Sequence, residues 1–258
     1  MSSQRVMLTA RDGAILKDLS VWGVLSLAQI RRRHFVNLAE SVSSERITKL
    51  HNAGLVCKQR VGILIHHGRP KEIGTVVTLT VAGLRIVHGS KTDCHKSLRP
   101  KPLNTSELHH DLLLVELADA LRKKHPNCHM VLGESSGGHA DLLRRVPDLV
   151  MSLASEHYAV ELELTAKSST RYRQILASYQ VSSNFDRVLY VVGNTHIAVK
   201  IARILRDHIT ATSPFGNFGR ISLEPLKEYF SEPNYTGTLE KITNNKKFGE
   251  KLNEKQCL

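Results

Sequence analysis

The stretch Tyr158-Ala159-Val160-Glu161-Leu162-Glu163-Leu164 alternates apolar and acidic residues, and the pair Pro147-Asp148 stands a short distance before it. Successive side chains of a β-strand point to opposite faces, so this alternation is typical of a strand. We expect its aliphatic residues to face a core, and Glu161 and Glu163 to lie together on the other face. Asp148 would belong to a preceding strand of the same sheet.

The three acids form a candidate metal site. Two carboxylates side by side on one strand repel each other, so a cation is expected to offset them, and Lys167 is a nearby candidate. Mg²⁺ prefers hard oxygen ligands and typically takes one or two carboxylates, with water and phosphate as its other ligands. The pattern therefore predicts phosphodiester hydrolysis, with Mg²⁺ or Mn²⁺ on Asp148, Glu161 and Glu163 and with Lys167 at the scissile phosphate.

These residues also carry a resemblance to known nucleases. The stretch resembles the PD-(D/E)xK nuclease superfamily and, more narrowly, the replication-relaxation family of plasmid proteins, which join a winged helix to such a domain and include the C-class mobilisation relaxases. The resemblance implies a restriction-endonuclease-like domain with a mixed central sheet, nicking of DNA at a plasmid origin-type site, and relaxosome proteins as partners. It rests on Pro147-Asp148, Glu161, Glu163, Thr165, Lys167, Arg171-Tyr172 and Tyr179.

One departure from the superfamily pattern keeps other interpretations open. Glu163 stands two residues after Glu161, where the superfamily has a lysine, and Lys167 lies further along with the same parity. A non-catalytic DNA-binding regulator or relaxosome accessory protein is the alternative. The strand could also lie at a sheet edge with a solvated acidic face, and Tyr172 or Tyr179 could act as a nucleophile.

The overall composition favours a polyanionic partner. The 258 residues carry a formal net charge of +12 with a pI near 9.7, which suits double-stranded DNA, although solubility or an anionic membrane surface would also explain it. No apolar run approaches the roughly 20 residues of a membrane helix, and the first residues lack a signal-peptide core. We expect a cytoplasmic protein. Its four cysteines are scattered and predict neither a zinc site nor a disulfide framework.

The first 89 residues predict a winged helix-turn-helix domain. Helices are expected over 8–19, with Thr9 as N-cap, over 26–35, and from Ser43 or Ser44 to Gly54; strands over 55–61 and 75–79 flank a basic turn. The third helix would enter the major groove and the turn would lie on phosphates, unless the domain binds protein instead. The predicted DNA contacts are Ser43, Ser44, Arg46, Thr48, Lys49, Arg69 and Lys71.

The rest of the chain predicts an α/β domain over 105–230, after a linker over 90–104 and before a basic flexible tail over 231–258. The expected order is a helix over 106–121, a strand over 128–134, the two acidic strands, a helix to Tyr179, a strand over 187–192 and a helix over 196–206. Arg171 and Arg173 could contact phosphates. Whether His110, Asp111 or Glu116 joins the acidic site or only packs is left open, as is a homodimer.

Overall fold

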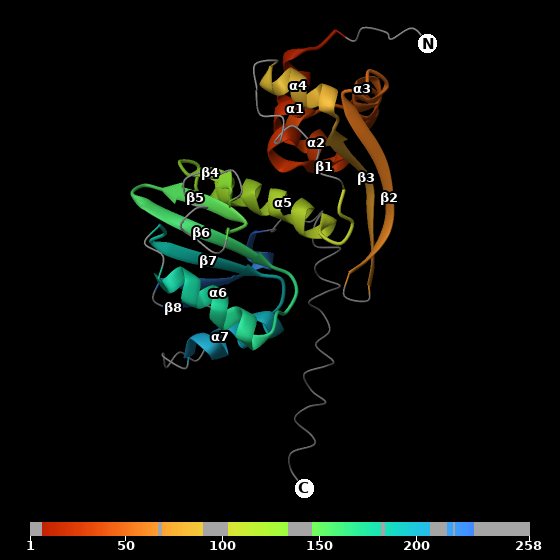
Figure 1. Cartoon of the computed structure of the whole chain (residues 1–258). Helices are drawn as coiled ribbons and strands as arrows, with labels where there is room; N and C mark the ends of the chain where they lie inside the picture. Colours follow the sequence, from red (N-terminus) through yellow and green to blue (C-terminus); the bar gives the residue numbers. More distant parts are fainter. Residues whose placement is uncertain are drawn as a thin grey trace. The chain divides into compact units, whose positions relative to one another are not determined.

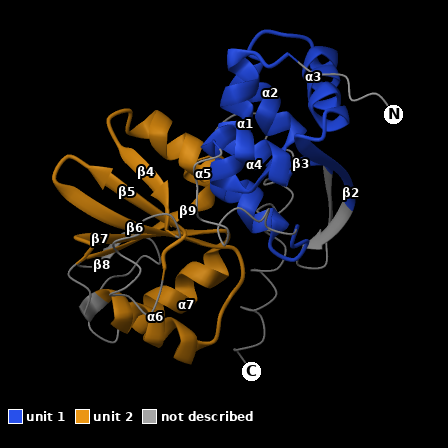
Figure 2. Cartoon of the chain, turned by 45° about the horizontal axis from the view of Figure 1, so that its top comes forward, with its two compact units in different colours: residues 1–115 blue, residues 116–258 orange. Residues whose placement is uncertain are grey.

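The structure, a computed structural model, describes residues 7–66, 69–89, 103–133, 146–181, 184–206, 216–218 and 220–229. Within these ranges the chain forms seven α-helices and two β-sheets, so the α/β class is confirmed (Figure 1). Two compact units, unit 1 (residues 1–115) and unit 2 (residues 116–258), are coloured separately in Figure 2.

The first two helices of unit 1 begin where the sequence predicts. Thr9 caps one helix through a reciprocal pair of hydrogen bonds with Asp12, and Ser26 caps the other in the same way with Gln29. Each capping box satisfies amide groups that the first turn leaves without a helical partner. The helices are α1 (Ala10–Trp22) and α2 (Leu27–His34).

The third helix, α3 (Glu40–Asn52), starts earlier than predicted. Ser43 lies inside it, fully buried, and donates its hydroxyl hydrogen to the Glu40 carbonyl at 2.8 Å, so it is not a cap. The predicted end is confirmed: Gly54 has φ 73°, and the Leu55 N–H reaches back to the Leu50 carbonyl at 3.0 Å. Glycine adopts this left-handed conformation without the strain that a Cβ brings.

The sheet of unit 1 has the order β1-β3-β2, with both pairs antiparallel. The long pair, β2 and β3, includes the two predicted strands and extends into the predicted basic turn. The short strand β1 and the helix after β3 were not predicted. Helices α1 and α3 pack with this sheet around a core that includes Ile15, Ile47 and Leu50. The additional elements are β1 (Val24–Ser26), β2 (Val56–His66), β3 (Arg69–Leu79) and α4 (Val81–His88).

Helix α5 (Leu108–Lys124) contributes residues to both units. Leu108 packs with Val24 and Val76 in unit 1, and Gln29 donates its amide hydrogen to the Leu112 carbonyl at 2.8 Å. These contacts explain why unit 1 extends to Val115 rather than stopping before a linker. Of the predicted linker 90–104 only residues 103 and 104 are described, and the predicted tail 231–258 lies outside the described residues.

The sheet of unit 2 is mixed, with the order β4-β5-β6-β7-β9-β8. Strands β4, β5 and β6 form an antiparallel meander, β7 runs parallel to β6, and β9 runs parallel to β7. The last two strands and the 3₁₀ helix after them were not predicted. Their bounds are β4 (His129–Leu132), β5 (Leu149–Leu153), β6 (Glu156–Glu163), β7 (Arg187–Val192), β8 (Gly216–Phe218), β9 (Ile221–Pro225) and the 3₁₀ helix Leu226–Tyr229.

Two helices cover one face of this sheet, α6 (Ser169–Val181) and α7 (Thr195–Arg206), and both agree with the sequence prediction (Figure 1). Their buried side chains form one core cluster with Ala159, Val188 and Tyr190 of the central strands. None of the helices in the described ranges is both long enough and apolar enough to cross a lipid bilayer.

Candidate functional site

The hairpin of β5 and β6 brings Asp148 to the acidic strand. Leu149 of β5 lies opposite Val160 of β6, and Asp148 comes immediately before the paired residues of β5. One oxygen of Asp148 accepts the backbone N–H of Leu162 at 2.7 Å. The predicted convergence of the first acid with the acidic strand therefore has a direct cause, which is the hairpin between β5 and β6.

The glutamates lie on an interior strand and are buried. Glu161 is 2% exposed and Glu163 is 3% exposed, although they share a face as predicted. In the parallel ladder their partners are Tyr190 and Val192, which belong to the core beneath α6 and α7. An edge strand with a solvated acidic face is therefore wrong, and so is the expectation that this face points away from a core.

Helix α6 and the loop before it supply the partners of the two glutamates. Tyr179 donates its hydroxyl hydrogen to Glu161, and the Lys167 ammonium forms an ion pair with Glu163. The Tyr172 hydroxyl accepts the Lys167 backbone N–H at 3.1 Å and is hydrogen-bonded to Glu163. A buried charge requires such partners, because leaving water without them is strongly unfavourable.

The two tyrosines are enclosed in the core. Tyr172 is fully buried and Tyr179 is 2% exposed. Burial raises the pKa of Tyr172 to about 12, and the negative charge of Glu163 adds to this rise, while the Lys167 N–H opposes it. Tyr172 therefore stays neutral near pH 7, and in this arrangement neither hydroxyl is presented to a DNA strand as a nucleophile.

The acidic cluster offers hard oxygen atoms, but several of them already have partners within the chain. Across the residues that the structure describes, no three His, Cys, Asp or Glu side chains gather in an arrangement that could hold a metal ion. Asp148 is half-buried, and about a third of the Lys167 side chain is exposed. Lys167 therefore contacts the buried Glu163 carboxylate and is also accessible to solvent.

The other predicted residues of this site are two arginines of α6 and three polar residues of α5. Arg171 and Arg173 are exposed at the start of α6, as a contact with phosphate would require. His110 and Asp111 pair with each other at 3.6 Å on the part of α5 that belongs to unit 1. Glu116 is buried on the part of α5 that belongs to unit 2.

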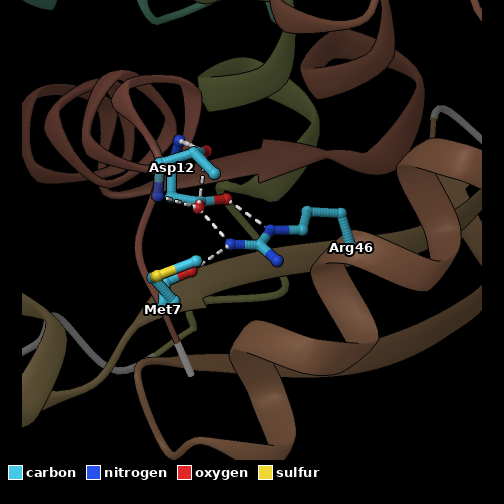
Figure 3. A network of polar contacts seen from close by, with 4 residues as sticks. Met7, Asp12 and Arg46 are labelled. Atoms are coloured by element: carbon cyan, nitrogen blue, oxygen red, sulfur yellow. Dashed lines mark hydrogen bonds and ion pairs between the residues drawn. The ribbon is translucent and has the colours of Figure 1, made fainter. Parts of the chain in front are cut away.

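In unit 1, the Arg46 side chain forms hydrogen bonds with the buried Asp12 carboxylate (Figure 3). Its Nε donates to one oxygen of Asp12 at 2.7 Å, its Nη2 donates to the other, and Nη2 also reaches the Met7 carbonyl at 2.9 Å. Asp12 is fully buried. Burial alone would raise the pKa of Asp12, but the hydrogen bonds from Arg46 and Thr9 outweigh it and lower that pKa below its ordinary value. Arg46 thus joins α3 to the start of α1.

The other residues of α3 that were predicted to contact DNA differ in whether their side chains are exposed. Ser43 is buried and cannot face DNA as predicted, because it lies on the helix face that packs on the core. Thr48 donates to the Ser44 carbonyl at 2.7 Å and accepts from the Lys58 ammonium at 2.8 Å. Lys49 is exposed. The side chains of Arg69 and Lys71 lie outside the described residues.

Two exposed residues of α3 that the sequence pattern did not single out are Val42 and Glu45. Ile47 and Leu50 are spaced as on one helical face, and that spacing alone could have placed Val42 and Glu45 on the opposite face. A pocket of about 220 Å³ opens beside them, with Arg11, Phe35, Val42, Glu45 and Lys49 among its lining residues.

Comparison of the chain with protein-family models, with curated proteins and with solved structures finds no match. The geometry and charge of the two clusters, one in each unit, are what indicate a function.

Proposed function

We propose that this protein processes DNA: unit 1 binds double-stranded DNA as a winged helix, and unit 2 nicks it at a specific site with Mg²⁺ or Mn²⁺. The observation that carries the proposal is the hydrogen bond that joins Asp148 to the backbone N–H of Leu162, between Glu161 and Glu163, with Lys167 next along the chain. By the family resemblance the role would be plasmid mobilisation or replication, with relaxosome proteins as further partners.

The architecture of each unit supports the proposal. In unit 1, three helices precede a long antiparallel pair of strands, which is the element order of a winged helix. In unit 2, an antiparallel meander is followed by a helix and a parallel strand, which suits a nuclease-like mixed sheet. The formal charge of +12 favours a polyanionic partner for the whole chain.

Each residue of the acidic cluster would have a separate task. Asp148 and Glu161 would hold the metal ion, with Glu163 beside them, because carboxylate oxygens are the ligands such ions prefer. When bound, the metal would polarise the scissile phosphate and orient an attacking water. Tyr179 would keep the Glu161 carboxylate in one orientation through its hydrogen bond. Lys167 would turn from Glu163 toward the phosphate and offset its developing charge.

A second candidate function is a DNA-binding regulator or relaxosome accessory protein without catalysis. The observation that favours it is that all three carboxylates accept a hydrogen bond or an ion pair from the chain itself. In this candidate the network would be purely structural and would join the β5–β6 hairpin to α6. The two candidates share the DNA-binding role of unit 1 and differ in whether unit 2 binds metal.

The test is incubation of the full-length protein with supercoiled plasmid that carries the DNA around its own coding region, with and without Mg²⁺ or Mn²⁺. Asp148→Asn and Glu161→Gln keep the side-chain shapes and remove the charges that would hold the metal. Glu156→Gln is the matched control, because Glu156 lies on the same strand but pairs with Arg187 near the surface. We expect metal-dependent conversion to open circles by wild type and by the control, and none by the two site variants.

Calorimetric titration with Mg²⁺ provides a second readout that does not depend on knowing the DNA site. A ligand that binds the native state raises its apparent stability, so wild type should bind Mg²⁺ and unfold at a higher temperature in its presence. Asp148→Asn should do neither. If wild type binds DNA in a salt-sensitive manner but shows no nicking and no Mg²⁺ binding, the regulator is the correct assignment.

A further inference from the structure

One face of α3 is exposed, and of its residues Val42, Glu45 and Lys49 only the lysine is among the predicted DNA contacts. Val42 is 40% exposed, and Glu45 and Lys49 are also exposed. Their spacing of three and four residues aligns them in one stripe. Ile47 and Leu50, both fully buried, lie on the opposite side.

Two arginines hold this helix in place rather than contacting a ligand. Arg46 forms its bidentate pair with Asp12, and Arg31 of α2 donates to Glu40 at 2.6 Å, at the start of α3. The middle of α3 is thus fixed to α1 by a pair with a buried carboxylate, and its beginning contacts α2 through an exposed pair. Rigid presentation matters for recognition, because contacts to base edges depend on an accurate helix position.

Glu45 and Lys49 retain their hydrogen-bonding capacity. Within the described part of the chain, no hydrogen bond or ion pair engages either side chain. An acidic residue in the middle of a basic DNA-binding face is unfavourable next to phosphates unless a base donor offsets it. In the major groove, a glutamate can accept from the N4 amino group of cytosine, an aliphatic side chain can contact the thymine methyl group, and a lysine can donate to guanine or phosphate.

The charge around this stripe favours DNA over a protein partner. Residues 7–89 contain twelve lysines and arginines against five acids. Of the basic residues, Lys49 and Lys58 lie on or beside α3, and Arg11 lines the adjoining pocket. Basic side chains therefore lie near the single acid of the stripe.

We propose that α3 reads base edges through Val42 and Glu45, with Val42 at a thymine methyl and Glu45 at a cytosine amino group, while Lys49 supplies affinity and Arg46 only positions the helix. This inference rests on the proposed DNA binding by unit 1. It assigns sequence specificity to residues that carry no resemblance motif, and it makes Glu45 a residue that excludes sites lacking cytosine at its position.

The test is selection of bound duplexes from a random DNA library by the full-length protein, followed by sequencing. Wild type should enrich a motif that contains an adjacent thymine and cytosine. Glu45→Ala should lose the cytosine preference by roughly tenfold or more, the expected size of one good base contact. Glu107→Ala, an exposed acid of unit 1 outside α3, is its matched control.

Two further variants, Val42→Ala and Lys49→Ala, separate the recognition of bases from the overall affinity for DNA. Replacing the selected thymine by uracil removes only a methyl group, so it should weaken binding by wild type and not by Val42→Ala. Lys49→Ala should keep the motif while weakening binding to all duplexes and flattening the salt dependence, whereas Lys17→Ala, an exposed lysine of α1, should change neither.

The two possible failures have different signatures. If wild type enriches a motif that Glu45→Ala and Val42→Ala leave unchanged, the base-reading assignment is wrong while DNA binding by unit 1 stands. If wild type shows no salt-sensitive binding to any duplex, both the inference and the proposed function of unit 1 fail. Unfolding followed by the fluorescence of Trp22, the single tryptophan, verifies that each variant is folded.

Discussion

Each unit contains a buried carboxylate paired with a basic side chain, but the two pairs are built differently. In unit 1, the Asp12 side chain is fully buried and meets two nitrogens of Arg46, whose side chain is 23% exposed. In unit 2, Glu163 is 3% exposed and meets the single ammonium group of Lys167, whose side chain is 34% exposed. The first pair joins two helices, and the second joins a central strand to the loop before α6.

The difference follows from the chemistry of the two cations. The guanidinium group of arginine is a rigid fork that matches a carboxylate, whereas lysine carries a point charge on a flexible stem. The Asp12–Arg46 pair, further supported by the Thr9 capping box, is therefore suited to holding α3 in one position. The Glu163–Lys167 pair is suited to opening, as a lysine that serves a phosphate must. The following predictions test whether this contrast holds.

The largest effect is expected for Asp12→Ala at neutral pH. The substitution removes the Asp12 half of the capping box and leaves Arg46 without its carboxylate, so unit 1 should lose about 3 kcal/mol of stability. Urea unfolding followed by the fluorescence of Trp22, which lies in α1, reports on this unit. Glu40→Ala is the control, because the Arg31–Glu40 pair is exposed at 40% and 74% and should contribute less than about 1 kcal/mol.

The same pair should make unit 1 sensitive to acid in a defined range. Because the pKa of Asp12 is lowered in the folded protein from an ordinary value of 3.8, its stabilisation is complete above that value. It is lost as the pH falls through the lower, folded pKa. The stability difference between wild type and Asp12→Asn should therefore be constant from pH 7 to about 5 and disappear at the most acidic end. A difference that stays constant down to pH 2 would contradict an ionised Asp12.

A smaller effect is expected for Lys167→Ala. The substitution leaves a buried glutamate without its cation, but the ammonium group of the partly exposed lysine is screened by water, so the loss in unit 2 should be about 1–2 kcal/mol. Glu163→Gln in the same chain should recover most of it, because the uncompensated charge is then gone. Calorimetry or circular dichroism is needed, since unit 2 contains no tryptophan. A loss as large as that of Asp12→Ala would abolish the contrast.

The sequence predicts elements whose signals are local. Strand β7 coincides with the predicted strand over 187–192, and Thr9, Ser26 and Gly54 mark helix ends as expected. The sequence predicts the start of α3 at Ser43 or Ser44, because serine is a good N-cap, but the helix begins at Glu40 after Ala39, without a side-chain cap, and Ser43 is buried inside it. Strand β1 was missed because its three residues become a strand only through pairing with β3, which lies far along the chain.

In the candidate site, too, the local sequence pattern predicts some features, and others depend on residues far along the chain. The shared face of Glu161 and Glu163 follows from period two, whereas their burial depends on α6, α7 and β7, which the alternation does not include. Arg46 was predicted to face DNA because it is basic and lies on the third helix. Its partner Asp12 stands 34 residues earlier, and nothing in the local pattern connects the two.

The smallest predicted effect, for Tyr172→Phe, tests whether Glu163 is held by one network or by separate contacts. Phenylalanine keeps the buried ring and removes the hydroxyl that accepts the Lys167 N–H and bonds Glu163, so unit 2 should lose about 1 kcal/mol. Tyr158→Phe is the control, since that tyrosine is half-buried and bonds Glu156 at 2.5 Å near the surface.

The double variant Lys167→Ala/Tyr172→Phe completes the cycle. If the two losses add, Lys167 and Tyr172 hold Glu163 independently, and the lysine can leave while the tyrosine keeps the carboxylate in place. If the double variant loses clearly less than the sum, the two contacts form one coupled network. Coupling of that kind would mean that Glu163, like Asp12, is held by one network from which its cation does not separate. It would favour the regulator over the nuclease.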